Sequence, residues 1–449
     1  MASSIKSTAL DTTAGSATRL LSLDALRGGT IALMVWVNHT FHPNLFDNPT
    51  LDAVHRQWFH IPWNEPAQGV TAADIVFPLF LFAAGASVPL SMKFGRGRDR
   101  KWWRTLLIAL KRGVVLYMLG VLLTVASAAY TRPLVWGDLL SWNILQLIAA
   151  AYVVCVGVFL LPRWWQVGIV STILLAKWGV MTLVPYDSVA ELGAARAAEG
   201  APTGTATWQH YQGVKEALNA PAIWFDRLVG WTSDTLFGPD EGTGDVLRDD
   251  RLGGFGWFGG FQQALPAAAI AVFGGWSSLV LVGSQGVARK LLLVLGGGVA
   301  LVLLALLLSG GYDASGTGWV GRFTVPSSKW FFSVPYCLLS AGIGMIVLSP
   351  LWWICDVKRW TTLFLLRVFG LNAIALYLGS EMLFKCIIAR WSIHTPAGDT
   401  ANLASGLIAW TERWTTSRVV GSLAWPVIYM TLWWLVLFWM DRRKLYLKV

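Results

Sequence analysis

The chain has 449 residues, of which 55% are hydrophobic and 13% charged, and its formal net charge is +10. A soluble globule of this size needs more polar side chains to cover its surface, so the composition excludes that class and predicts a polytopic membrane protein. The four cysteines do not have the paired spacing of a zinc site or of a disulfide framework.

Residues 1–18 are rich in Ser, Thr and Ala and lack the apolar core of a signal peptide, which predicts a disordered cytoplasmic tail. Apolar runs long enough for a helix to cross the hydrocarbon then recur along the chain. We expect an all-α fold in which residues 19–440 form one transmembrane domain and 441–449 a basic cytoplasmic tail. The ten predicted spans are 21–41, 70–92, 107–130, 141–161, 165–184, 261–283, 290–309, 330–350, 362–386 and 422–440.

The positive charge is concentrated in alternate connections between these spans. The connection between the second and third spans has one acid, Asp99, and six bases: Lys93, Arg96, Arg98, Arg100, Lys101 and Arg104. Such connections are typically cytoplasmic, which predicts that both termini are cytoplasmic too. The connection at 185–260 contains eleven acids and five bases, so we expect an external insertion. Because topology accounts for the basic residues, no nucleic-acid partner is expected.

The first predicted span has polar residues near both ends. Asp24 and Arg27 are three residues apart at its cytoplasmic end, a spacing at which they can pair with each other. Asn38 follows fourteen residues after Asp24, on about the same helix face and roughly 21 Å along the axis. Asn38 taken alone is better explained by an interhelical hydrogen bond that stabilises the bundle. The pattern predicts one helix face that is polar near both membrane surfaces.

His60 lies in the first external loop, and Asp74 lies where the second span begins. A carboxylate beside an imidazole fixes the ring tautomer and stabilises its protonated form, as a general base requires. Each residue alone is also typical of a membrane interface.

Four histidines fall within 22 residues: His39, His42, His55 and His60. Their spacing matches no metal-binding motif, and Pro43 interrupts the helix, so no metal site is predicted.

Two later stretches also contain ionisable groups. VFGLNAIALYLGSEML places Asn372, Tyr377 and Glu381 in one predicted span, where a carboxylate needs a partner or a proton. PSSKW places Lys329 at the external entrance of a span, where a lysine that extends to water is the simpler interpretation. Tryptophans near the insertion suit either a sugar platform or a membrane interface. They are Trp208, Trp224, Trp231 and Trp257.

Taken together, these motifs resemble the heparan-alpha-glucosaminide N-acetyltransferase family. The matching stretches are RLLSLDALRGGTIALMVWVN, His60-x-x-Trp63-Asn64, TAADIVFPLFLFAAGASVPLSM, PSSKW and FGLNAIALYLGSEM. The resemblance implies a multi-span enzyme that takes acetyl-CoA from the cytosol and acetylates a glucosamine amine, as in heparan sulfate-type glycans, on the opposite side. Two departures are the EPAQGV link before Thr71 and the 185–260 insertion.

The resemblance implies Asn38, His60 and Asp74 as catalytic residues. We expect His60 to take the proton of the acceptor amine, Asp74 to orient the imidazole, and Asn38 to donate to the thioester oxygen. A covalent acetyl-histidine is the competing pathway. The residues expected to bind acetyl-CoA are Asp24, Arg27, Lys329 and Asn372, and those expected to bind the sugar are Trp63, Asn64 and Glu381.

The expected location is a bacterial inner membrane, with the active-site loop on the external, periplasmic side. The resemblance also suggests a homodimer. Two other functions stay open at this point. One is an O-acetyltransferase for an envelope polysaccharide. The other is a proton-coupled secondary transporter, in which Asp74 and Glu381 would relay protons and Arg27 would hold an anion.

Overall fold

The computed structural model describes residues 20–60, 70–94, 100–128, 143–183, 257–310, 325, 327–329, 332–360 and 364–447. These residues are helical apart from connecting segments and one antiparallel hairpin, in which β1 (Ser392–His394) pairs with β2 (Thr400–Asn402). The helices are α1 (Leu21–Asn38), α2 (Pro49–Arg56), α3 (Ala72–Lys93), α4 (Trp102–Ala128), α6 (Ile144–Phe159), α7 (Arg163–Leu183), α11 (Trp257–Leu281), α12 (Val287–Ser309), α13 (Val334–Trp352), α14 (Phe364–Leu371), α15 (Ala373–Leu383), α16 (Leu403–Thr415) and α17 (Arg418–Arg442). Short π-helical turns, Trp353–Val357 and Phe384–Ile388, extend α13 and α15.

The helices confirm the all-α polytopic membrane fold. Six of the described helices are long and apolar enough to cross a bilayer, or seven if the bent pair α14 and α15 forms one span. Each of the ten predicted ranges overlaps a described helix, but α1, α6 and α7 are too polar or too short to meet that criterion. The number of ten spans and the side on which the termini lie therefore stay predictions. Residues 1–18 and nearly all of the 185–260 insertion lie outside the described residues.

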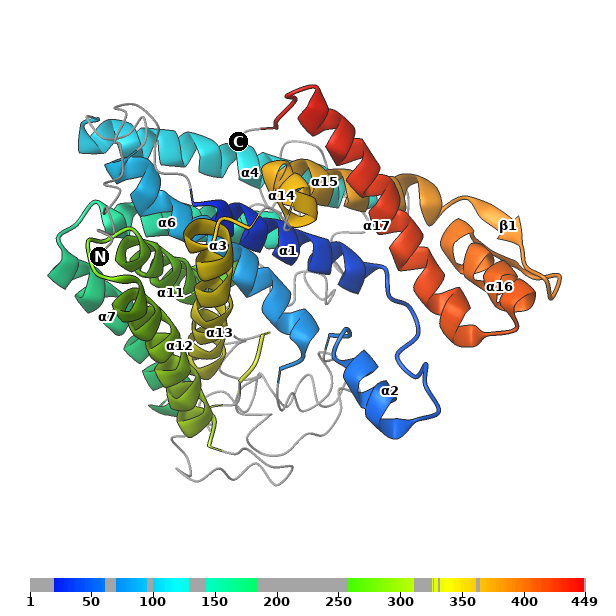
Figure 1. Cartoon of the computed structure of the whole chain (residues 1–449), viewed down its shortest axis with the longest axis horizontal. Coiled ribbons are helices and arrows are strands. Elements are labelled where there is room, and N and C mark those ends of the chain that lie inside the picture. The colour runs from blue at the N-terminus through cyan, green and yellow to red at the C-terminus, as the bar shows by residue number, and fades with distance from the viewer. Residues whose placement is uncertain are drawn as a thin grey trace, which may run out of the picture.

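The helices form an inner group and an outer group. In α3 and α11, 72% of the apolar window is buried, against 17% in α12 and 22% in α17. Figure 1 shows α1 and α3 in the middle of the molecule, α7, α11, α12 and α13 on one side, and α17 with α16 and the hairpin on the other. The outer helices expose large apolar side chains such as Leu292, Leu303 and Leu432. An apolar outer surface of this extent fits a bilayer as the surrounding solvent.

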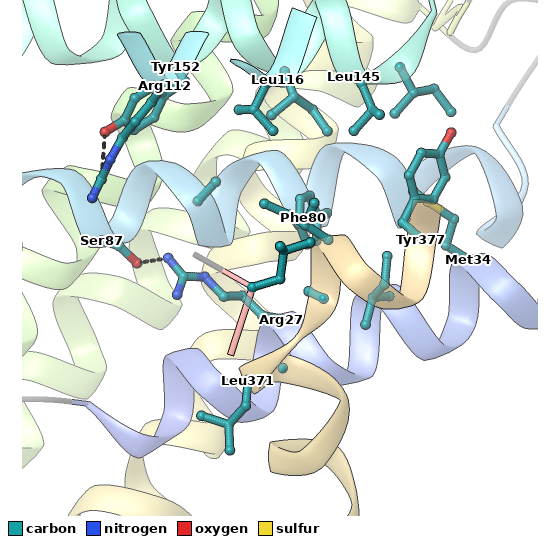
Figure 2. A pocket seen from close by; sticks show the side chains of 18 of the residues that line it. Arg27, Met34, Phe80, Ser87, Arg112, Leu116, Leu145, Tyr152, Leu371 and Tyr377 are labelled. Carbon is teal, nitrogen blue, oxygen red and sulfur yellow. Dashed lines mark hydrogen bonds between the residues drawn. The ribbon is translucent and has the colours of Figure 1, made fainter. Parts of the chain in front are cut away.

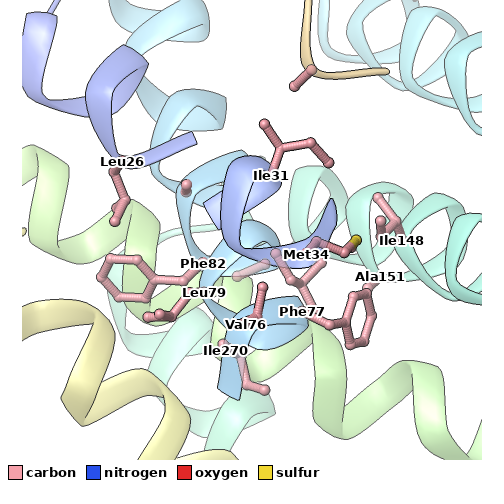
Figure 3. Packing of buried hydrophobic residues seen from close by; sticks show 14 of the residues in the cluster. Leu26, Ile31, Met34, Val76, Phe77, Leu79, Phe82, Ile148, Ala151 and Ile270 are labelled. Atoms are coloured by element: carbon pink, nitrogen blue, oxygen red, sulfur yellow. The ribbon is translucent and has the colours of Figure 1, made fainter. Parts of the chain in front are cut away.

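The core lies between α1, α3, α6 and α11 (Figure 3). Phe82 of α3 and Ile270 of α11 are fully buried in it. These two helices approach closely through glycine, because a Cβ at Gly85 would lie 2.0 Å from the carbonyl oxygen of Ala271. Small residues allow such close helix packing in membranes, where water does not drive the helices together.

Two contacts position α1, which carries three of the predicted site residues. Its first backbone amides donate to the carboxylate of Asp356, from Leu21 at 2.8 Å and from Ser22 at 3.1 Å. A carboxylate at this end satisfies unpaired amides and stabilises the helix dipole. In its N-terminal half α1 packs against α14, and a Cβ at Gly28 would lie 1.6 Å from the carbonyl oxygen of Leu366. Both contacts fix α1 to the part of the chain that precedes α15.

The range 362–386, predicted as one span, is instead divided into α14 and α15, which meet at an angle of 76°. The break lies at Asn372, whose side chain is buried. Its amide nitrogen donates to the carbonyl oxygen of Leu445 at 3.1 Å, and its oxygen accepts from the amide of Leu447 at 3.0 Å. The C-terminal segment therefore satisfies the polar group at the break, and Asn372 ties that segment to the helix pair.

Candidate active site

His60 and Asp74 are in direct contact at the N-terminal end of α3. The Nδ1 atom of His60 lies 2.8 Å from Oδ1 of Asp74. The other carboxylate oxygen of Asp74 accepts from the hydroxyl of Thr71 at 3.0 Å and from its backbone amide at 3.3 Å, in a capping box. The Asp74 side chain is 3% exposed and that of His60 40% exposed. Asp74 is thus fixed by the helix end, while His60 stays open to a ligand.

Two residues from the segment around the start of α13 complete this cluster. The Nζ atom of Lys329 lies 3.1 Å from Nδ1 of His60 and 3.5 Å from Oδ1 of Asp74. The hydroxyl of Tyr336, which is fully buried, donates to the backbone carbonyl oxygen of Asp74 at 2.7 Å. The first turn of α3 is therefore held against α13, and Lys329 is held against the His60–Asp74 pair.

Asn38 lies in a second polar cluster at the C-terminal end of α1. Its amide nitrogen donates to Oε1 of Glu381 in α15 at 2.7 Å. The other carboxylate oxygen of Glu381 is 3.1 Å from the Nζ atom of Lys385, one turn later. Glu381 is 12% exposed and has found the partners that a carboxylate at this position needs. This hydrogen bond orients the Asn38 amide group toward α15.

A cavity of about 330 Å³ lies between α1, α3, α4, α6 and α15. Its polar lining includes Arg27, which donates to the hydroxyl of Ser87, and Arg112, whose guanidinium is 3.3 Å from the hydroxyl of Tyr152. Figure 2 shows these two pairs together on one side of the cavity, with Met34 and Tyr377 toward the other side. The remaining lining is mostly apolar. The cavity therefore has a cationic end and an apolar body.

The helix faces that line the cavity lead toward Asn38. Arg27, Ile31 and Met34 line it from α1, and Asn38 is one turn beyond Met34 on the same face. From α15, Tyr377 lines the cavity, and Glu381 is one turn further along. The Asn38–Glu381 hydrogen bond thus lies one turn beyond the cavity, roughly 16 Å from Arg27 along α1.

Among the predicted site residues, the structure brings together His60, Asp74 and Lys329, and it pairs Asn38 with Glu381. Arg27 lines the cavity, whereas Asp24 and Asn372 lie beside it. The carbonyl oxygen of Asp24 packs on Gly370, and Asn372 lies between the lining residues Leu371 and Ala373. The remaining two predicted residues, Trp63 and Asn64, lie outside the described residues.

Several residues at these sites were missed by sequence reasoning. Two had a local signal: Thr71 stands three residues before Asp74, as in a capping box, and Lys385 stands four residues after Glu381, as in a helical ion pair. Ser87, Arg112 and Tyr152 had none, because each is an ordinary polar residue in an apolar helix and only the fold brings them to one cavity.

The other histidines between residues 39 and 60 make contacts within the fold. The ring of His39 is buried and lies 4.1 Å from that of Tyr429 and 4.7 Å from that of Phe384. His55 makes a 2.8 Å hydrogen bond to the carbonyl oxygen of His42. Among the described residues, no group of three His, Cys, Asp or Glu side chains is arranged to hold a metal ion.

Residues 19–191 match the model of a family described as a domain of unknown function, DUF5009. Heparan-alpha-glucosaminide N-acetyltransferase from Homo sapiens is 30% identical over 138 residues, which are 30% of this chain and 18% of that protein. The protein of the same name from Mus musculus is 30% identical over 146 residues, 32% of this chain and 20% of that protein. Over these residues the chain is similar to heparan-alpha-glucosaminide N-acetyltransferase and to the DUF5009 family.

Similarity to members of the heparan-alpha-glucosaminide N-acetyltransferase family covers only part of each protein. The aligned region spans about a fifth of the length of these curated relatives. The DUF5009 match contains Arg27, Asn38, His60 and Asp74, whereas Lys329 lies beyond it. For the residues after 191, the expected roles therefore depend on the contacts that the structure gives them.

Proposed function

We propose that the chain is a transmembrane acetyltransferase that moves the acetyl group of cytosolic acetyl-CoA to the amine of a glucosamine-type sugar on the external face of a bacterial inner membrane. The observation that carries this proposal is the 2.8 Å contact between His60 and Asp74, with His60 exposed. The similarity to these N-acetyltransferases supports the reaction class. The name shared by the two relatives supports the choice of acceptor.

In this reaction His60 acts as the general base. Because Asp74 accepts from Nδ1, the Nε2 atom keeps its lone pair and can take a proton from the acceptor amine. The amine nitrogen then forms a bond to the thioester carbonyl carbon, and the carbon–sulfur bond breaks. The proton on Nε2 passes to the leaving thiolate, which restores neutral His60. Asp74 stabilises the imidazolium between these two steps.

Asn38 stabilises the oxyanion that develops on the thioester oxygen. An asparagine amide has two N–H donors, and Glu381 accepts from one of them. The second N–H of Asn38 is free to donate, and its orientation is fixed by the Glu381 contact. Preorganised donors of this kind lower the barrier because they need no reorganisation during the reaction. Glu381, together with Trp63 and Asn64, is also expected to contact the sugar.

The cavity suits one part of acetyl-CoA. Its volume of about 330 Å³ is near the lower end for small-molecule pockets, roughly 300–1,000 Å³. We therefore assign the apolar body to the pantetheine arm, and Arg27 and Arg112 to phosphate groups at the cytoplasmic end. Asp24 and Asn372 support this site by packing on the residues that line it. The arm would carry the acetyl group along α1 toward Asn38.

The test is to incubate purified protein with labelled acetyl-CoA and glucosamine. We expect labelled N-acetylglucosamine from the wild type and none from His60→Ala. Full activity of His60→Ala would contradict the assignment of the base. Hydroxylamine cleaves an ester but not an amide, so release of the label would identify O-acetylation instead. Label retained on the protein in the absence of acceptor would identify an acetyl-histidine pathway.

Arg27→Ala tests the cavity separately. We expect weaker acetyl-CoA binding, because a charge-assisted contact to phosphate is lost. Arg104→Ala is the matched control, since Arg104 lies at the start of α4 against the ring of Trp103 and does not line the cavity. Equal affinities of the two variants would refute the phosphate assignment.

A secondary transporter is the second candidate, and the break between α14 and α15 favours it. Transporters use discontinuous helices to bind their substrates. The described residues contain one such bent pair, at 76°, beside the cavity. The same incubation separates the two candidates, because a transporter would neither transfer the acetyl group nor need His60 to bind its substrate.

A further inference from the structure

Lys329 has a position that neither of its expected roles explains. A lysine that extends to water keeps its ammonium exposed, yet the Lys329 side chain is only 20% exposed. Lys329 was expected to bind acetyl-CoA, but it does not line the cavity that we assign to this cofactor. Its ammonium instead lies 3.1 Å from Nδ1 of His60 and 3.5 Å from Oδ1 of Asp74.

Lys329 and Asp74 compete for the same atom of His60. Nδ1 has either one proton or one lone pair, so it can donate to Asp74 or accept from Lys329, but not both. Donation to Asp74 leaves the lone pair on Nε2, which is the base form. If Nδ1 instead accepted from Lys329, the proton would lie on Nε2, and this atom could not act as a base. The contact to Asp74 is shorter, 2.8 Å against 3.1 Å, and Lys329 has the carboxylate as a second acceptor.

The charges of the cluster also bear on the protonation of His60. The charged side chains that contact His60, among the described residues, are Asp74 from α3 and Lys329 from the segment before α13. Asp74 alone favours the imidazolium, and an ammonium at a similar distance opposes it. Burial lowers the pKa of Lys329, while the Asp74 carboxylate counteracts this by favouring the charged form. The Asp74 carboxylate and the Lys329 ammonium together therefore present little net charge to the imidazole.

We propose that Lys329 is a positioning residue that offsets the charge of Asp74 and so keeps His60 unprotonated, with Nε2 available as a base, at pH values where the His60–Asp74 pair alone would be protonated. This inference depends on the proposed function for its meaning in catalysis. The protonation of His60 can be measured without any acetyl transfer. The two proposals can therefore fail separately.

The experiment measures the reaction of His60 with diethyl pyrocarbonate as a function of pH. Only unprotonated imidazole reacts, and peptide mapping by mass spectrometry reports each histidine separately. We expect Lys329→Met to raise the pH of half-maximal His60 reactivity by about one unit, because an opposing charge is removed. Lys329→Arg keeps the charge and should restore the wild-type profile. The exposed His394 in β1 is an internal control whose profile should not move.

Asp74→Asn provides the reciprocal measurement and should lower the pH of half-maximal reactivity of His60. It also protects the test against a Lys329→Met variant that does not fold. Unchanged His60 profiles in Lys329→Met and Asp74→Asn would overturn the proposal. So would a Lys329→Met variant that binds acetyl-CoA more weakly while its His60 profile stays that of the wild type, because Lys329 would then be a ligand of the substrate.

Discussion

At the scale of single residues, Asp74 combines a structural and a chemical role. Its Oδ2 atom accepts from Thr71 and caps α3, whereas its Oδ1 atom faces His60 and Lys329. The cap fixes the carboxylate before any substrate arrives. Preorganisation of this kind is what a base-orienting residue needs. The two oxygens make the two roles separable by mutation.

Thr71→Val should remove the cap and leave the chemistry in place. We expect a loss of about 1 kcal/mol in stability, the usual cost of an N-cap, with acetyl transfer reduced by less than about tenfold. Asp74→Asn keeps the shape but loses the charge beside His60, and we expect a loss of activity of roughly 10²–10⁴-fold. Thermal unfolding and initial rates measure both. An equal loss of activity in Thr71→Val and Asp74→Asn would mean that Asp74 cannot orient His60 without the helix cap.

The residue scale also shows what the sequence can predict. His60 and Asp74 are fourteen residues apart and lie on either side of one loop. The polarity pattern identifies each of them, but their joint role was expected from the family resemblance and their contact could not be read from the sequence. Lys329 is 269 residues from His60, and Glu381 is 343 residues from Asn38. Contacts across such separations depend on how the helices pack. Hydropathy and spacing identify each polar residue but do not say which partner it meets.

At the scale of elements, α1 and α14 approach through two glycines. A Cβ at Gly28 would meet the carbonyl oxygen of Leu366, and one at Gly370 would lie 2.1 Å from that of Asp24. Neither oxygen can move without moving its helix backbone. The close approach positions Gly370 and Leu371 at the cavity, so this packing shapes the proposed acetyl-CoA site.

Gly28→Ala tests this packing, and Gly29→Ala is its matched control. We expect Gly28→Ala to destabilise the protein by about 1–3 kcal/mol, because the added methyl group forces the helices apart. At Gly29 the nearest atom is the side-chain Cδ1 of Leu366 at 3.9 Å, so an added methyl group fits. Gly29→Ala should be neutral or slightly stabilising, since Ala is the better helix former. Equal melting temperatures of the two variants would contradict the packing argument.

The break at Asn372 marks the limit of prediction for whole elements. Its neighbours are apolar and include no proline, so the hydropathy pattern predicts one continuous helix. The buried amide is satisfied by residues more than seventy positions later, which no local pattern reveals. The hairpin was also missed, although Pro396 and Gly398 form a turn signal between its strands. The helices themselves were predictable because hydrocarbon leaves the backbone few other choices.

Asn372→Ala should release the C-terminal segment from the α14–α15 break. The amide of Leu447 and the carbonyl oxygen of Leu445 lose their partner, and Leu447 lines the cavity. We expect faster hydrogen exchange at residues 445–447 and weaker acetyl-CoA binding. Tyr446→Phe is the control, because it removes the 2.8 Å contact to Asp441 and keeps both bonds to Asn372. If acetyl-CoA affinity fell equally in both variants, loss of the Asn372 contacts would not be the cause.

At the scale of the whole molecule, the proposed reaction requires a path between two membrane faces. The cationic end of the cavity and the His60 cluster belong to opposite ends of α3, since Ser87 is thirteen residues after Asp74. That separation is roughly 20 Å along the helix axis. A donor bound at one face and an acceptor at the other can therefore meet only through the helix bundle. The proposal consequently depends on which face is cytoplasmic.

Cysteine labelling from one side of the membrane decides this orientation. In a Cys386→Ser background the remaining cysteines, Cys155, Cys337 and Cys355, are buried. Asp399→Cys, in the turn between β1 and β2, should react with an impermeant maleimide in intact cells, because its connection is predicted to be external. Lys101→Cys, before α4, should react only after permeabilisation, because its basic connection is predicted to be cytoplasmic. The reverse pattern would place the His60 cluster in the cytosol, and transfer of the acetyl group to an external sugar would then be excluded.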